Sequence, residues 1–92
     1  MNKADKSYLS RVAAIGCLVC LNLGHEGTPA EIHHPRSMGA MGKKAPHSAA
    51  LPLCPNHHRL GGYGFAIHAG QEEWERLYGT EMELLTQLRG MI

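Results

Sequence analysis

The chain has 92 residues, a formal net charge of +1 and three cysteines. A chain this short buries a modest apolar core and usually needs another source of stability, such as a bound metal. The odd cysteine count argues against a disulfide framework. Neither a signal peptide nor an apolar stretch of about eighteen residues is visible, which excludes a membrane span. We therefore expect a cytoplasmic protein, where paired thiols more often bind metal than form disulfides.

Charge is distributed unevenly along the sequence. Residues 33 to 68 contain four basic and no acidic side chains, a charge of +4, whereas residues 69 to 92 contain five glutamates and two arginines, a charge of −3. The middle of the chain could face phosphates while its end faces water. A solvated surface with accidental clustering is the alternative. The basic side chains are Arg36, Lys43, Lys44 and Arg59.

The first predicted element is a short amphipathic helix over residues 5 to 15. Tyr8, Val12 and Ile15 recur at helical spacing, and Gly16 follows as a plausible residue to end the helix. This helix would deliver the next residues, a C-x2-C pair, into a tight turn.

Two short strands are expected next, over residues 30 to 34 and 49 to 53, because both segments are bounded by proline or glycine. Helical signals return after Gly70, and Thr80 with Glu83 has the pattern of a capping box that starts a further helix. We expect these acidic helices only to cover the core.

The chain as a whole is predicted to be one α+β domain, residues 1–92, because no repeat or linker divides it. Its parts are the N-terminal helix, a zinc knuckle at residues 17–20, a hairpin at 30–53 and a helical remainder at 55–92.

A structural zinc site is predicted from two pairs of residues with metal-ligand spacing. Cys17 and Cys20 form C-x2-C, and Cys54 with His57 forms C-x2-H. Together they supply the four ligands of a closed tetrahedral Cys3His site. Three buried cysteines without a metal are the alternative, since free cysteine packs as a small apolar residue.

Two histidine doublets, His33-His34 and His57-His58, indicate a second metal site. His58 lies about 100° around a helix from His57, so the two rings can serve different sites. Ligation by His33 and His58 would leave coordination positions for water and a phosphate oxygen, with His34 placed to take a proton from the attacking water.

These motifs resemble a known family. Glu31-Ile32-His33-His34 followed by Leu51-Pro52-Leu53-Cys54-Pro55-Asn56-His57-His58-Arg59 resembles the ββα-metal core of HNH endonucleases. The order of motifs, from the leading C-x2-C to Ala66-Ile67-His68-Ala69, is most similar to phage recombination-enhancement nucleases that depend on RecA. The resemblance covers about residues 11 to 80.

The resemblance implies a role for each matching histidine. His33 and His58 would bind the catalytic metal, with His68 as a candidate third ligand or, alternatively, a residue that caps or packs the next helix. His34 would be the general base, and His57 the last structural zinc ligand. Cleavage would leave 5′-phosphate and 3′-hydroxyl ends.

The sequence departs from the HNH pattern before the second cysteine-containing motif. Members of that family carry an asparagine there, whereas residues 46 to 50 read Pro-His-Ser-Ala-Ala. His47 could replace it by holding the loop or orienting His34, or could be a plain loop histidine. From the sequence we also expect no basic N-terminal extension of the kind that members of the recombination group can carry.

The predicted function is a metal-dependent DNA endonuclease or nickase in phage or prophage recombination or repair. Its cofactors would be a structural zinc and one catalytic divalent ion, for which imidazole ligands suit Zn²⁺, Ni²⁺ or Mn²⁺ better than Mg²⁺. DNA would be held by its backbone with little base specificity, a RecA filament is a partner implied by the resemblance, and no membrane is involved. The competing hypothesis is a non-catalytic, zinc-containing DNA-binding or protein-interaction module. The predicted phosphate-binding residues are Arg36, Lys43, Lys44 and Arg59, of which the two lysines could also be a plain solvated pair.

Overall fold

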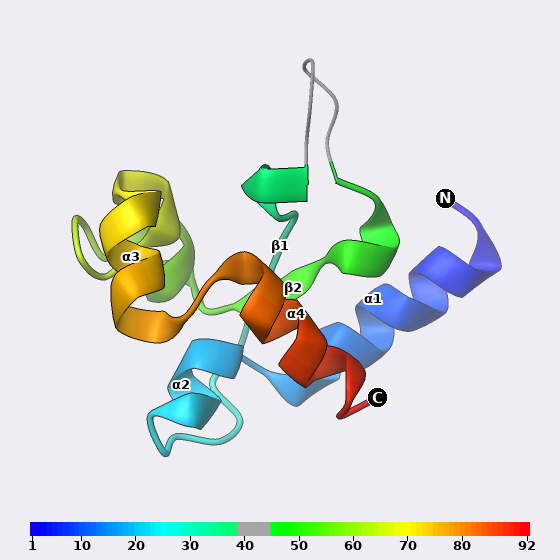
Figure 1. Ribbon diagram of the computed structural model, residues 1–92. Helices are drawn as coiled ribbons and strands as arrows, with labels where there is room; N and C mark the ends of the chain where they lie inside the picture. Colours follow the sequence, from blue (N-terminus) through cyan, green and yellow to red (C-terminus); the bar gives the residue numbers. More distant parts are fainter. Residues whose placement is uncertain (39–44) are drawn as a thin grey trace.

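The computed structural model describes residues 1–38 and 45–92, so the predicted phosphate-binding residues Lys43 and Lys44 lie outside the described residues. The described residues form an α+β fold, as predicted, with a two-stranded sheet and α-helices around it (Figure 1). In chain order its helices and strands are α1 (Lys3–Ile15), α2 (Leu18–Asn22), β1 (Glu31–His33), β2 (Leu51–Leu53), α3 (Gln71–Tyr78) and α4 (Glu81–Arg89). No helix in this part of the chain is both long and apolar enough to cross a membrane.

Four short turns of other helix types complete the described fold. Three are 3₁₀ turns, η1 (Arg36–Met38), η2 (His47–Ala49) and η4 (Ile67–Ala69), and one is a π turn, η3 (Asn56–Leu60). The segment after position 55 is therefore less continuously helical than the sequence predicts. The glycine-rich residues 61 to 66 separate η3 from η4.

Helix α1 begins at Lys3, before the predicted start at position 5, because Asn2 caps it. The Asn2 side-chain oxygen accepts a hydrogen bond from the backbone N–H of Asp5 at 2.7 Å, which satisfies one of the amides that every helix start leaves unpaired. The end of the helix at Ile15 is as predicted. Gly16 follows with a φ of 83°, a left-handed conformation that glycine adopts without penalty.

Strands β1 and β2 pair antiparallel, with Glu31 opposite Leu53 and His33 opposite Leu51. Both are shorter than the predicted 30–34 and 49–53, since β1 stops before His34 and Ala49 already belongs to η2.

Proline 52 sits inside β2, opposite Ile32. Proline has no N–H to donate, but in a two-stranded sheet each strand has one outer edge, where this loss has no cost.

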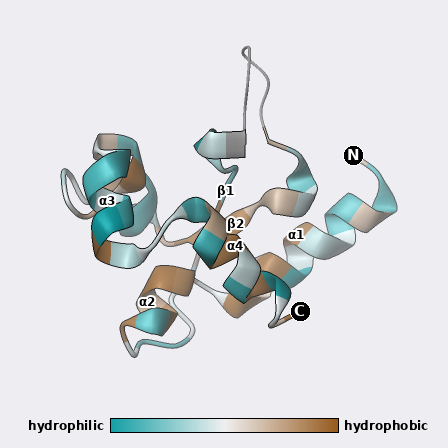
Figure 2. Ribbon diagram, in the orientation of Figure 1, coloured by the Kyte–Doolittle hydropathy of each residue, from teal (hydrophilic) through white to brown (hydrophobic). Residues whose placement is uncertain are grey.

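The apolar core lies around β2, which is contacted by α1, α2 and α4. Figure 2 shows hydrophobic residues along β2, on α2 and toward the C-terminal end of α1. Trp74 is fully buried, and Tyr78 packs against the core beside it with ring centroids 5.4 Å apart. The other large, fully buried apolar side chains are Val12, Leu18, Val19, Leu51, Leu53, Ile67, Leu85 and Leu88.

Helix α4 starts with the predicted capping box. The backbone N–H of Glu83 donates to the Thr80 hydroxyl at 3.0 Å, and the Thr80 N–H donates to a Glu83 carboxylate oxygen at 2.9 Å. The reciprocal pair fixes the first turn of the helix, and with it the position of Glu81.

Glycine 16 joins α1 to the first cysteine, and we expect Gly16→Ala to destabilise the protein more than Gly24→Ala. Both glycines have positive φ, 83° and 97°, so alanine costs about 1–2 kcal/mol of backbone strain at either position. A Cβ on Gly16 would also lie 2.8 Å from the Thr28 carbonyl oxygen, whereas a Cβ on Gly24 meets nothing within 4 Å. Urea unfolding of both variants with zinc present measures the difference, and equal losses would contradict the role assigned to the close approach at Thr28.

Candidate metal centres

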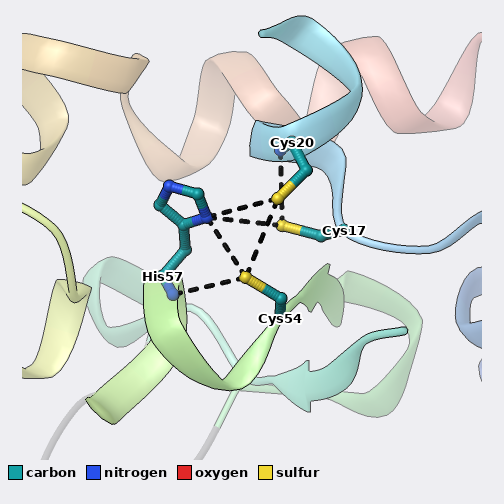
Figure 3. Close-up of side chains that lie close together, drawn as sticks. All are labelled: Cys17, Cys20, Cys54 and His57. Atoms are coloured by element: carbon teal, nitrogen blue, oxygen red, sulfur yellow. Dashed lines mark hydrogen bonds between the residues drawn. The ribbon is translucent and has the colours of Figure 1, made fainter. Parts of the chain in front are cut away.

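Three cysteines and one histidine, far apart in the sequence, meet in the core. Cys17 caps the start of α2 and Cys20 lies within that helix, while Cys54 directly follows β2 and His57 lies in η3. Figure 3 shows the four side chains pointing toward one another. The ligand atoms of this Cys3His cluster all lie within 4.8 Å of one another, as the sequence spacing predicts.

The distances within the Cys3His cluster match a tetrahedral zinc site. Zinc bond lengths of about 2.3 Å to sulfur and 2.0–2.1 Å to nitrogen give tetrahedral edges of about 3.8 Å between two sulfurs and about 3.6 Å between sulfur and nitrogen. The Cys20 and Cys54 sulfurs are 3.8 Å apart. The His57 Nδ1 lies 3.2, 3.5 and 3.8 Å from the sulfurs of Cys54, Cys20 and Cys17. The residues are therefore positioned to hold a metal ion such as zinc.

The surroundings of the Cys3His cluster favour a bound cation. Burial raises the pKa of the Cys17 thiol to about 12 and lowers the pKa of His57. Without a metal, burial therefore favours the protonated thiol. A bound metal ion reverses this preference, because it binds the thiolate and releases the proton. Backbone N–H groups of Cys20 and His57 point at the sulfurs of Cys17 and Cys54, each at 3.4 Å, which stabilises negative charge on sulfur.

The ring of His57 is held in place by stacking on Phe65, with centroids 4.4 Å apart and planes 6° from parallel. A Cβ on Gly61 would lie 2.5 Å from the Phe65 ring, so only glycine at this position allows the stack. This contact fixes the direction in which Nδ1 of His57 points.

A second group of histidines, the imidazole cluster, consists of His33, His58 and His68. His33 is the last residue of β1, His58 follows His57 in η3, and His68 lies in η4. Their candidate ligand atoms all lie within 4.8 Å of one another, and the Nε2 atoms of His58 and His68 are 3.1 Å apart. That separation falls between the edges of about 3.4 Å and about 2.9 Å that tetrahedral and octahedral sites with 2.0–2.1 Å bonds require.

Adjacent residues supply the two clusters. His57 is 3% exposed and faces the cysteines, while His58 faces His33 and His68 across ring centroid distances of 5.1 and 4.7 Å. The π turn η3 carries both. Such turns are rare in proteins and occur often at functional sites. The two neighbouring histidines thus belong to different clusters, and the assignment of the second cluster as a metal site stays a prediction.

Two of the three clustered imidazoles lie within hydrogen-bond distance of a carboxylate. The Nδ1 of His58 lies 2.9 Å from Glu31, which also binds the Arg59 guanidinium through both carboxylate oxygens at 2.9 and 2.6 Å. These hydrogen bonds from Arg59 and His58 lower the pKa of Glu31 to about 2. Arg59, predicted to bind phosphate, is thus engaged by a neighbouring carboxylate.

The second carboxylate is Glu81, the first residue of α4, which is fully buried. Burial alone would raise its pKa, but hydrogen bonds from His33 and from η1 outweigh burial and lower the pKa to about 2. His33 Nε2 lies 2.6 Å from its Oε2. The expectation that the acidic C-terminal helices only cover the core is therefore wrong at this residue.

His34 and His47 lie side by side, with His34 Nε2 3.0 Å from His47 Nδ1 and ring centroids 5.1 Å apart. The structure thus places His47 where it can orient His34, the predicted general base. Both His34 and His47 are partly buried.

The basic residues predicted to hold DNA differ in their surroundings. Arg36 is exposed and lies close enough to the imidazole cluster for its charge to help lower the pKa of His68, an effect that follows burial and the neighbouring His58 and His33 in size. Arg59 pairs with Glu31.

Sequence reasoning missed both carboxylates. Glu31 had a usable signal, because residues two apart on a strand share a face and Glu31 precedes His33 by two. Glu81 had none, since it is 48 positions from the histidine it contacts.

The structure is a small α+β fold in which a Cys/His cluster is positioned to hold a metal ion. The family model described as recombination enhancement, RecA-dependent nuclease, matches residues 2–92, and the chain belongs to this family. The resemblance seen in the sequence is confirmed at this level. Membership assigns the chain to nucleases that act in recombination, hydrolases of nucleic acid that bind DNA. Comparison with curated proteins gave no match.

We expect metal analysis of the purified protein to return a tightly held zinc at the Cys3His cluster. Because zinc-binding free energies in small domains reach roughly 10 kcal/mol, Cys54→Ser should release this zinc and unfold the chain. Elemental analysis and circular dichroism measure the two effects. A Cys54→Ser protein that keeps a stable fold without zinc would show that the cluster does not support the structure.

Proposed function

We propose that the chain is a metal-dependent endonuclease of the HNH type, which hydrolyses phosphodiester bonds in DNA with His34 as general base. The proposal rests above all on one observation: imidazoles from three separate segments converge, and one of them, His33, directly precedes His34 in the chain. Family membership supports the nuclease activity itself. The HNH type, the metal requirement and the residue roles are the parts we add.

His33, His58 and His68 would hold the catalytic ion, and their nitrogen atoms fit such an ion as judged by their separations. A divalent ion held there supplies positive charge at the scissile phosphate and its leaving oxygen. Three imidazoles leave coordination positions for water and phosphate oxygens, in contrast to the closed Cys3His set. Imidazole ligands favour Zn²⁺, Ni²⁺ or Mn²⁺ over Mg²⁺.

His34 would accept a proton from the water that attacks phosphorus, and His47 would hold the His34 ring in the orientation for this transfer. The hydrogen-bond distance between the two rings, 3.0 Å, supports this division of roles. His47 thereby stands in for the asparagine of the HNH pattern. Proton transfer by a positioned side chain contributes about 10²–10⁴-fold to a reaction rate.

Arg36 is the best supported of the proposed phosphate contacts, because it is exposed and its charge acts on the imidazole cluster. A contact of this kind binds the DNA backbone and is sensitive to salt. For Arg59 the same role would require it to bind DNA while paired with Glu31, and Lys43 and Lys44 remain predictions from sequence.

We expect the protein to nick supercoiled plasmid DNA with Mn²⁺, and His34→Ala to lower the rate by about 10²–10⁴-fold while metal binding persists. His58→Ala should lose both the second metal and the cutting. His25→Ala, a change at an exposed loop histidine, is the matched control and should cut like the parent. Agarose gels and a metal titration separate these results. DNA binding without any cutting by the parent would instead favour the non-catalytic module.

RecA dependence is proposed from the family description alone. We expect nicking of DNA to rise when RecA filaments are assembled on it with a slowly hydrolysed ATP analogue, compared with naked DNA at equal salt. RecA without nucleotide is the control. Equal rates on both substrates would contradict RecA dependence and leave the nuclease assignment intact.

A further inference from the structure

Hydrogen-bond donors from the described residues surround the Glu81 carboxylate. Its Oε2 accepts from His33 Nε2 at 2.6 Å and from the backbone N–H of Arg36 at 2.9 Å. Its Oε1 accepts from the Ser37 N–H and hydroxyl at 3.0 and 2.8 Å and from the Gln71 amide at 2.8 Å. Charge-assisted hydrogen bonds of this kind keep a buried carboxylate ionised.

An ionised carboxylate accepts hydrogen bonds only, so its partner nitrogen must carry the proton. In neutral His33 the proton therefore sits on Nε2, and the lone pair that can bind a metal is on Nδ1. The same reasoning applies to Glu31 and His58. The proton of neutral His58 sits on Nδ1, and its Nε2, the atom 3.1 Å from His68, carries the lone pair.

We propose that Glu81 and Glu31 are positioning residues of the imidazole cluster, each fixing the tautomer and the ring orientation of one metal-binding histidine. The proposal rests on the proposed function for its metal, and concerns residues that touch neither metal nor substrate. Carboxylates that accept from the outer nitrogen of a ligating histidine typically change metal affinity by 10–100-fold when removed.

The two carboxylates act from different parts of the fold. Glu31 lies two residues before His33 on β1 and reaches across to His58 in η3. Glu81 begins α4 and reaches back to the end of β1, where it also holds the first backbone amides of η1. The C-terminal helix is thereby part of the metal centre.

A purely structural role for Glu81, tying α4 to η1, is the competing explanation. It predicts a loss of stability with no effect on the tautomer of His33. Glutamine in place of glutamate separates the two, because an amide can offer either its oxygen or its NH₂ group to His33 and so no longer dictates which ring nitrogen carries the proton.

The test compares Glu81→Gln, Glu31→Gln and Glu83→Gln in the zinc-loaded protein. Glu83→Gln removes one charge from the same helix, and glutamine also serves in a capping box, so it is the matched control. Long-range ¹H–¹⁵N NMR spectra of the histidine rings report the tautomers directly. A Co²⁺ titration, followed by absorbance, reports affinity at the imidazole cluster.

We expect the parent and Glu83→Gln to show His33 protonated at Nε2 and His58 at Nδ1. Glu81→Gln should alter the signals of His33 alone and Glu31→Gln those of His58 alone, each with about 10–100-fold weaker Co²⁺ binding and the Cys3His zinc retained. Unchanged tautomers, or Co²⁺ affinities within about twofold of the parent, would overturn the proposal.

Two safeguards keep the outcome decisive. If Glu81→Gln does not fold, Glu31→Gln decides the question, since Glu31 is only partly buried and its loss leaves the core intact. The tautomers can be measured without a second metal ion and without DNA cleavage. If the tautomers change in the glutamine variants while the parent never cuts DNA, the nuclease mechanism fails and the positioning role stands. If the tautomers do not change while the parent cuts DNA, the positioning role fails and the nuclease mechanism stands.

Discussion

The structure depends on the closure of the Cys3His cluster, because it joins the end of α1 to the end of β2 across 34 to 40 residues of sequence. A sheet of two three-residue strands is too small to be stable alone. A zinc ion bound by the four side chains from these two segments would supply the missing stability, since ligation free energy becomes folding free energy when the site exists only in the folded state. The positions of the other elements around β2 follow from this closure.

The same closure places the imidazole cluster. His57 belongs to the Cys3His cluster and His58 to the imidazole cluster. Because the two residues are adjacent, the contacts that hold His57 against the cysteines and Phe65 also fix the backbone at His58. His33 is positioned near this segment by its pairing with Leu51, which lies three residues before Cys54. A structural site and a candidate reactive site therefore share one short segment, and a change that loosens the first displaces the second.

Much of this arrangement follows from local sequence. Three local motifs each predict structure from only a few residues, and each lies where the sequence predicts. They are the x2 spacings of the cysteines, the histidine doublets and the Thr80 capping box. The strand ends and the π turn are harder to predict from the sequence, because they depend on how the segments pack. The role of Glu81 could not be predicted from the sequence for the same reason. An acidic residue after a helix cap is ordinarily exposed to solvent, and only the tertiary fold brings His33 and η1 to Glu81.

The burial of Glu81 also changes how the charge of the chain is interpreted. From sequence, five glutamates after position 68 form an acidic face that turns to water. In the fold, one of these glutamates, Glu81, is buried against His33, and Glu31 in turn pairs with Arg59. Among the described residues, Arg36 then supplies positive charge near the cluster, and under the proposed function a cation held by the imidazoles would be the larger local charge. Affinity for DNA and metal occupancy are thus expected to be coupled in this protein.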